Sequence, residues 1–420
     1  MPLTLAERII AAHAGVDSVA AGQIVVADVD VAIAQDGTGP LAIQQLRDLG
    51  KVHVKAPTAV FFIDHSAPAP RSELANAHLL IRDFCAETGA TLSDVEMGVC
   101  HQRVAESFAK PGDIVIGADS HTCMAGALGA FGTGMGSTDV AIGMATGKTW
   151  LRVPETFRVE IDGALPSGVE AKDIILTLIG KLGADGATYK ALEFGGPVVE
   201  ALPMHGRLTL ANMAVEAGAK AGLVASDETT RAFLIAQGRE ADWRPLAADE
   251  GATYERVVHL AAGELVPMVA APHTVDNVHP ARELAGVKVD QVLIGTCTNG
   301  RLEDLRAAAA ALRGRQRAPH TRLIVTPASA AVWKAAADEG ILQTFVGAGA
   351  LVTNPGCGAC VGVHEGILAD GDVCVSTANR NFKGRMGNPE GSIYLASPTT
   401  AIACAVAGVI SDPRDLGERS

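Results

Sequence analysis

Three of the eight cysteines have neighbours and spacing that suit a metal centre. Cys357 and Cys360 form a Cys-x-x-Cys pair within NPGCGACVG, and Cys297 lies sixty positions earlier within GTCTNG. A structural zinc site normally uses four ligands, and a redox dithiol needs only the Cys-x-x-Cys pair. Three thiolates on an iron–sulfur cluster would leave one iron free to act as a Lewis acid. The spacing alone leaves the cluster, zinc, a redox dithiol and inert buried thiols all open.

The other five cysteines lie in apolar or helical stretches of the sequence. We interpret them as small buried hydrophobic residues, because an unpaired cysteine away from polar groups behaves as one. They are Cys85, Cys100, Cys123, Cys374 and Cys404.

Several acidic side chains lie beside histidines, an arrangement that suits proton transfer. A carboxylate next to an imidazole orients the ring and raises its basicity. Any single pair is more often structural, and Asp119 followed by Ser120 is also a good helix cap. The candidate acid–base residues are Asp64, His65, His101, Asp119, His121 and Glu193, and Ser120 beside Asp119 is a candidate substrate-binding residue.

Two further polar segments suit an anionic ligand. The motif NRNFKGR contains Asn379, Arg380 and Arg385, and arginines in such a loop bind carboxylates through two parallel hydrogen bonds. Gln35 ends the apolar run at Val31 and precedes an acidic residue. The glycine-rich run from Gly126 lacks the lysine of a phosphate-binding loop, so we interpret it as tight packing near the site.

The elements that carry these residues are predicted to be buried strands. Short β-branched runs begin at Asp113, Val289, Thr321, Gly349 and Asp372, and polar or glycine-rich residues follow each of them. Open α/β sheets bind ligands at the carboxyl ends of their strands, so five such segments in one chain favour a functional site. Alanine-rich amphipathic stretches from Arg301 and from Ala330 predict intervening helices.

The composition predicts an α/β protein with parallel strands covered by helices on both faces. Hydrophobic residues make up 48% of the 420 residues, and 46 are glycine. The proline-containing segment 266–286 is the best candidate for a linker. We therefore predict N-terminal α/β/α subdomains over residues 1–286, with the acid–base motifs, and a C-terminal α/β/α subdomain over residues 287–420, with the cysteines and arginines.

Charge and hydropathy exclude several classes of partner. A net charge of −13 without a basic stripe argues against a nucleic-acid surface. The first residues lack the pattern of a signal peptide, and no run of about 18 apolar residues predicts a membrane span. Scattered, unpaired cysteines are typical of reduced thiols, so we expect a cytoplasmic protein.

Taken together, these motifs resemble the aconitase superfamily, and within it the large subunits of the isopropylmalate isomerase (3-isopropylmalate dehydratase) and homoaconitase branch, in its shorter, archaeal-type form. The resemblance runs from Ala6 through the helix after Ser397. Its most specific segments are GTCTNG, NPGCGACVG, ADSHT, NRNFKGR and the stretch from Asn212. The resemblance implies an aconitase-like fold of several three-layer subdomains around a 4Fe–4S cluster, without the mobile swivel domain of single-chain aconitases.

The resemblance also implies roles for individual residues. Cys297, Cys357 and Cys360 match the ligands of one 4Fe–4S cluster. Asp119 and His121 resemble the pair that assists loss of the hydroxyl group, and Arg380 and Arg385, beside Asn379, match substrate-carboxylate or catalytic arginines. The remaining matches to active-site positions are Gln35, Asp64, His65, His101 and Glu193.

The implied reaction is a dehydration followed by rehydration of a small hydroxy-polycarboxylic acid. A separate small subunit is expected to supply the swivel domain and the base, and leucine biosynthesis is the expected role. Homoaconitase and methylmalate or 2,3-dimethylmalate dehydratases are the alternatives within the branch. An electron-transfer protein, which would use a fourth cluster ligand, and a nucleic-acid-binding role of the cluster-free form are the rivals from other classes.

Overall fold

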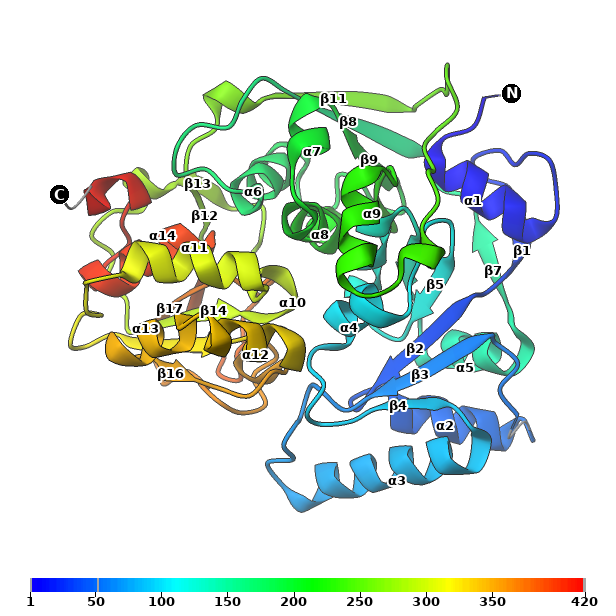
Figure 1. Ribbon diagram of the computed structural model, residues 1–420, viewed down its shortest axis with the longest axis horizontal. Helices are drawn as coiled ribbons and strands as arrows, with labels where there is room; N and C mark the ends of the chain where they lie inside the picture. The colour runs from blue at the N-terminus through cyan, green and yellow to red at the C-terminus, as the bar shows by residue number, and fades with distance from the viewer. Residues whose placement is uncertain (1, 51–52, 418–420) are drawn as a thin grey trace.

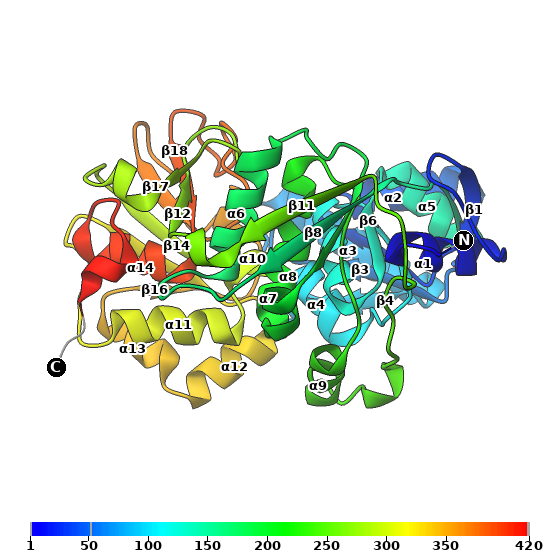
Figure 2. The same ribbon diagram turned by 90° about the horizontal axis from the view of Figure 1, so that it is seen from above.

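The computed structural model describes residues 2–50 and 53–417, and its strands form three larger sheets and one short ribbon. The three sheet-containing units lie side by side, with the middle unit next to both of the others (Figures 1 and 2), and the first and third units also contact each other, as in the bridge between Gly98 and Ser329. Most strand pairs within the three sheets are parallel, as the composition predicts. The structure therefore confirms an α/β fold.

The first unit contains a five-stranded parallel sheet with helices on both faces. In spatial order its strands are β4 (Thr91–Ser93), β3 (Thr58–Phe62), β2 (Val31–Gln35), β5 (Ile114–Gly117) and β6 (Phe131–Gly134). Its helices are α2 (Gly39–Asp48), α3 (Ser72–Thr88), α4 (Cys100–Ser107), α5 (Ser137–Thr146) and the 3₁₀ helix η1 (Ser120–Leu128). Phe61 packs into one hydrophobic cluster with α2, α3 and α5, and its neighbour Phe62 packs into another with α4 and η1. This alternation builds three layers.

The middle unit has a four-stranded parallel sheet. Its strands, in spatial order, are β10 (Ala221–Val224), β9 (Ala191–Gly195), β8 (Thr156–Asp162) and β11 (Arg256–Ala261). Its helices are α6 (Ala171–Leu182), α7 (Pro197–Ala201), α8 (Met204–Met213), α9 (Glu228–Ala236) and the short η2 (Ala214–Ala217). Gly126 of η1 lies against this unit so closely that a Cβ there would be 1.8 Å from the carbonyl oxygen of Gly222. The glycine-rich run is therefore a site of tight packing, as its sequence predicts.

The third unit has a seven-stranded mixed sheet. Its strands, in spatial order, are β13 (Val278–Pro280), β12 (Met268–Ala270), β18 (Ser392–Ala396), β17 (Val373–Ser376), β14 (Gln291–Gly295), β15 (Arg322–Thr326) and β16 (Leu351–Val352). Its helices are α10 (Thr296–Asn299), α11 (Leu302–Leu312), α12 (Ala330–Asp338), α13 (Ile341–Gly347) and α14 (Pro398–Ala407). The strands expected after Val289, Thr321, Gly349 and Asp372 and the helices expected from Arg301 and Ala330 are all confirmed.

The boundary predicted at 286/287 differs from the sheet topology. β12 and β13 lie within the segment 266–286 that we interpret from sequence as a linker, yet β12 pairs antiparallel with β18 of the third sheet. Three prolines mask these short strands in the sequence, because proline is compatible with strand ends and edges but not with a central strand. The third sheet therefore begins at Met268, before the predicted boundary.

A short ribbon and one helix complete the fold. β1 (Ile24–Asp28) pairs antiparallel with β7 (Lys148–Arg152), and α1 (Leu5–Ala14) packs on β1. Across the described residues, no helix is both long and apolar enough to cross a membrane.

The end of α1 carries an ion pair whose pH dependence is testable. His13 Nε2 lies 2.6 Å from Asp30 Oδ2. Burial lowers the pKa of His13, but the hydrogen bond and charge of Asp30 outweigh it and raise the pKa above its ordinary value. Such a group contributes stability that is complete below the unfolded-state pKa and is lost as the pH rises through the folded-state pKa. We expect the free energy of unfolding to fall above about pH 6.5, and His13→Gln to remove at most ~1 kcal/mol of that change.

Urea unfolding at a series of pH values measures this slope. Asp113 faces the same pair, and burial raises the pKa of Asp113 to about 7, so it gives a slope of the same sign at lower pH. The variant Asp113→Asn removes the contribution of Asp113 to the pH dependence, so that the contribution of His13 can be measured by itself. An unchanged slope above about pH 6.5 in His13→Gln would contradict the prediction.

Candidate active site

The three cysteines of the sequence motifs come from two loops of the third unit. Cys297 lies in α10, directly after β14, and Cys357 and Cys360 lie in the loop after β16. All three side chains are buried. The backbone N–H of Cys357 donates to the carbonyl oxygen of Asp64 over 2.8 Å, which ties this loop to the first unit. The thiols therefore lie where the third unit meets the acid–base residues.

Polar hydrogen-bond donors surround the sulfur atoms. Asn212 Nδ2 lies 3.3 Å from Cys297 Sγ, and Asn379 Nδ2 lies 3.7 Å from the same atom. Arg385 Nη2 lies 3.9 Å from Cys360 Sγ. A hydrogen bond from Cys357 lowers the pKa of Cys360 well below its ordinary value, and the charge of Arg385 acts in the same direction. Burial raises the pKa of Cys297, and the hydrogen bond with Cys360 together with burial raises the pKa of Cys357. These groups therefore favour thiolate, the form that binds metal, at Cys360.

The spread of the three thiols tests which metal group they suit. Ligands about 2.3 Å from one zinc ion lie at most about 4.6 Å from each other. Among the described residues, the groups of three ligand atoms that lie within 4.8 Å of one another are Asp64, His65 and Cys100, and His101, Asp119 and His121. The three cysteines do not form such a group. Near them, Thr296 Oγ1, Asn379 Oδ1 and Arg385 Nε are buried without a hydrogen-bond partner. This donor set fits a polynuclear iron–sulfur cluster better than a single zinc ion.

Asp119 is the centre of the acid–base residues. Its Oδ1 lies 3.0 Å from His101 Nε2 and accepts a hydrogen bond of 2.9 Å from the backbone N–H of His121. Its Oδ2 lies 3.5 Å from His65 Nε2. Burial would raise the pKa of Asp119, but the charge of His101 and the hydrogen bonds from the histidines hold it well below its ordinary value. Asp119 is therefore a permanent anion that orients three imidazoles, and it also caps η1.

Asp64 and His65 form a second layer of the same network. His65 Nδ1 lies 2.9 Å from Asp64 Oδ1, and Asp64 Oδ2 accepts from the backbone N–H of Cys100 over 2.7 Å. Burial lowers the pKa of His65, but the carboxylates of Asp64 and Asp119 outweigh it and raise the pKa well above its ordinary value. His65 is therefore a cation near neutral pH, wedged between two carboxylates.

Asp36 anchors the backbone of the segment that contains Asp64 and His65. Its carboxylate accepts hydrogen bonds from the backbone N–H groups of Asp64, His65 and Ser66 at 2.8–3.1 Å. His78 Nε2 lies 3.2 Å from the same carboxylate. Asp36 directly follows Gln35, so its position at a strand end was visible in the sequence, but its anchoring role depends on contacts across the sheet.

Glu216 joins all three units, although it is not among the site residues predicted from the sequence. It lies in η2 of the middle unit, and its Oε1 is 2.8 Å from His121 Nε2 of the first unit. The same oxygen accepts from Arg380 Nε of the third unit over 2.9 Å. Burial raises the pKa of Glu216, but His121 and Arg380 outweigh it and lower the pKa. A sequence motif does point to Glu216, because this residue lies in the segment from Asn212 that carries the family resemblance.

Glu193 has a different environment from the one expected. It lies in β9, and its carboxylate accepts from the backbone N–H of Leu5, from Arg158 and from the hydroxyl of Tyr254. These contacts join α1 to the middle sheet. The structure therefore does not bring Glu193 to the acid–base network, and Glu216 is the glutamate that lies there.

The expected substrate-binding residues lie in three places. Asn379 Nδ2 donates to Asn212 Oδ1 over 3.0 Å, and Arg380 and Arg385 contact Glu216 and Cys360 as described, so these three lie beside the thiols. Gln35 Oε1 accepts from the backbone N–H of Gly37, so its amide is turned back on its own loop. Ser120 begins η1 beside Asp119.

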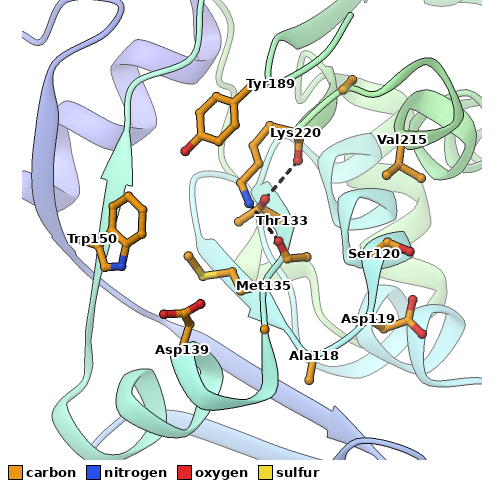
Figure 3. A pocket seen from close by; sticks show the side chains of 13 residues that line it. Ala118, Asp119, Ser120, Thr133, Met135, Asp139, Trp150, Tyr189, Val215 and Lys220 are labelled. Atoms are coloured by element: carbon orange, nitrogen blue, oxygen red, sulfur yellow. Dashed lines mark hydrogen bonds between the residues drawn. The ribbon is translucent and has the colours of Figure 1, made fainter. Parts of the chain in front are cut away.

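Asp119 and Ser120 also border a cavity of about 520 Å³ between the first and middle units. Trp150, Tyr189 and Lys220 line its other walls, and Lys220 Nζ donates to the carbonyl oxygen of Gly134 (Figure 3). In this view the Asp119 side chain points away from Trp150. The cavity thus lies behind the acid–base network rather than within it.

Comparison with known proteins identifies the family. The family model "Aconitase family (aconitate hydratase)" matches residues 7–285 and 277–408. The chain is 57% identical to the 3-isopropylmalate dehydratase large subunit of Elusimicrobium minutum, over 99% of this chain and 100% of that one. It is also 56% identical to 3-isopropylmalate dehydratase large subunit 2 of Archaeoglobus fulgidus, over 99% of this chain and 100% of that one. The identity to 3-isopropylmalate dehydratase large subunit 1 of Thermotoga maritima is 56% as well, over 99% of each chain.

A solved structure agrees with the fold. The crystal structure of Thermococcus kodakaraensis aconitase X in its holo-form superposes with a TM-score of 0.52 at 14% sequence identity, and the match covers 84% of each chain. The family model, the full-length relatives and the α/β units around the thiols lead to one conclusion: the chain belongs to the aconitase family and is a hydro-lyase.

Proposed function

We propose that this chain is the catalytic large subunit of a 3-isopropylmalate dehydratase, which isomerises a hydroxy acid by dehydration and rehydration. The observation that carries the proposal is the 57% identity over the whole chain to a relative with that name. Membership of the aconitase family implies a 4Fe–4S cluster. We assign one such cluster per chain to Cys297, Cys357 and Cys360, since their thiols are all buried and do not gather closely enough to share a single zinc ion.

The cluster, when bound through three thiolates, supplies an iron that acts as a Lewis acid toward the substrate oxygen atoms. Arg380 and Arg385 lie in the same loop, after β17 and beside the thiols, and their guanidinium groups bind and orient the substrate carboxylates. Arg380 is held by Glu216, which leaves its other N–H groups available for a ligand.

Proton transfer to the leaving hydroxyl group is assigned to the imidazoles around Asp119. His121 is the proposed donor, because it lies between Asp119 and Glu216, 3.4 and 2.8 Å away, and two carboxylates fix the orientation of its ring. His101 and His65 share the carboxylate of Asp119 and complete the network. The proton on the neighbouring carbon is assigned to a base from a partner chain.

That partner is a separate small subunit. The names of the relatives, all of them large subunits, imply such a partner. The proposed assembly is a heterodimer or larger heteromer, in which the small subunit contacts the variable group on the far carbon of the substrate.

The assay of the complex tests the function. The large subunit, reconstituted anaerobically with its small subunit, is expected to convert isopropylmalate with a kcat/KM at least about 10-fold above those for homocitrate, methylmalate and dimethylmalate, because a pocket shaped for one apolar group discriminates by about 10–200-fold. Faster conversion of homocitrate would instead identify a homoaconitase. Absence of turnover of every substrate by the cluster-loaded complex would overturn the proposal, and the large subunit alone is the control.

A further inference from the structure

The first turn of α6 reaches from the middle unit into the back of the active site. Figures 1 and 2 both show α6 beside β12, and the two elements are in contact. Lys172, in this turn, is fully buried. Its Nζ donates to the carbonyl oxygen of Thr377 over 2.8 Å and to that of Ala378 over 2.5 Å. These two residues follow β17 and immediately precede Asn379 and Arg380.

Two neighbours of Lys172 bind the third unit as well. Asp173 Oδ1 accepts from the backbone N–H of Met268 at the start of β12 over 2.8 Å. Glu170 Oε2 accepts from the backbone N–H of Thr399 in α14 over 3.4 Å. The first turn of α6 therefore forms hydrogen bonds to the third unit through three side chains. Of these, Lys172 binds the backbone directly before Asn379.

Thr377 links the backbone held by Lys172 to the loop that carries Cys297. Its hydroxyl donates to the carbonyl oxygen of Gly295 over 2.6 Å and accepts from the backbone N–H of the same residue over 2.9 Å. Gly295 lies two positions before Cys297. A single buried ammonium group thus holds the backbone from which Asn379 and Arg380 project, and Thr377 couples that backbone to the loop of Cys297.

Stability alone does not explain a lysine at this position. Among the described residues no carboxylate forms an ion pair with Lys172, although the charges of Cys360, Asp304, Cys297 and the adjacent Asp173 favour its protonated form. Burial lowers the pKa of Lys172 to about 7, which shows how unfavourable the position is for a cation. An apolar side chain of similar length would avoid this cost of burying a charge, so what the lysine adds at this position is its two hydrogen bonds to the carbonyl oxygens of Thr377 and Ala378.

We propose that Lys172 is a positioning residue, which fixes the backbone of Thr377 and Ala378 and thereby aligns Arg380 for the substrate carboxylate and Cys297 for the cluster. The inference rests on the proposed function for the identity of the substrate, but its contacts are independent of which hydroxy acid binds. Because a misplacement of about 1 Å costs about 100-fold in rate, loss of the restraint has a large kinetic effect.

The test uses the cluster-loaded complex with the small subunit. Lys172→Met preserves the length of the side chain and removes its charge and donors, and Thr377→Val removes the hydroxyl link to Gly295. Both are expected to lower kcat/KM by about 100-fold, with a rise in KM, and to alter the EPR spectrum of the reduced cluster. Thr377→Ser keeps the hydroxyl and is expected to retain wild-type kinetics and spectrum. If Lys172→Met does not fold, the comparison of Thr377→Val with Thr377→Ser tests the inference.

Arg207→Met is the control for general destabilisation. Arg207 is also fully buried and donates to two backbone carbonyl oxygens, but its partner is Asp227 in the middle unit. This variant is expected to lower the melting temperature and to leave KM and the EPR spectrum of its folded fraction unchanged. Equal kinetic effects in Arg207→Met, or wild-type values in both Lys172→Met and Thr377→Val, would overturn the inference.

Failure of the proposed function gives a different pattern. In that case the wild-type complex itself converts none of the hydroxy acids. The EPR spectrum needs no substrate, so a spectral change in Lys172→Met and Thr377→Val, absent in Thr377→Ser and Arg207→Met, still supports the inference. An unchanged spectrum in both would reject it.

Discussion

Cys357→Ser is expected to abolish both the iron–sulfur absorbance and the conversion of the hydroxy acid, with a loss of turnover of at least about 10³-fold. Lewis-acid stabilisation by a metal contributes several kcal/mol, and each 1.36 kcal/mol is about tenfold in rate. A serine oxygen is a poor replacement for a thiolate on a soft iron–sulfur centre. Absorbance, iron and sulfide content, and turnover of the anaerobic complex measure the effect.

Cys404→Ser is the matched control for the cysteine prediction. Cys404 is equally buried, but its thiol contacts only the backbone of Ser411 among the described polar groups. This variant is expected to keep its absorbance and turnover and to lose a little stability. Full activity of a cluster-free Cys357→Ser preparation would refute the assignment of the ligands and the Lewis-acid role together.

Asp119→Asn is expected to lower kcat by about 10³-fold or more while the cluster remains bound. Positioned acid–base groups contribute about 10²–10⁴-fold, and Asp119 orients three of them. Its lowered folded-state pKa contributes stability that is present above the unfolded-state pKa and is lost only as the pH falls through the folded value. The carboxylate is therefore charged throughout the neutral range, and the asparagine amide both removes that charge and offers donors where the imidazoles also donate.

Glu193→Gln is the companion measurement for Asp119→Asn. The sequence predicts a catalytic glutamate at 193, whereas the structure places its carboxylate against Arg158, Tyr254 and the start of α1. We expect Glu193→Gln to lower the midpoint of urea unfolding and to keep kcat within a few-fold of wild type. A loss of kcat as large as that of Asp119→Asn, with the fold intact, would restore Glu193 to the catalytic residues.

The convergence of three units explains why Glu216 matters to the arrangement. It connects His121, which lies 95 positions away, with Arg380, which lies 164 positions away. Neither the order of the strands in a sheet nor the periodicity of a helix predicts these contacts. A carboxylate shared by a histidine and an arginine from different units also means that a shift of any unit relative to the others disturbs the site.

The sequence by itself determined the features that depend on short stretches of chain. Buried strands such as β5 and β14, the polar residues at their ends, and the three cysteines with their small neighbours were all predictable, because strand periodicity and motif spacing are local properties. The parallel α/β class follows from the same patterns.

Only the tertiary structure decided which of these residues meet. It drew β12 and β13 into the third sheet across the predicted boundary, and it placed Glu216 rather than Glu193 beside His121. It also buried Lys172 behind the turn before Asn379. The physical reason is that such contacts depend on how whole sheets pack against one another. That packing is set by many weak apolar contacts between residues far apart in the chain, which no local pattern records.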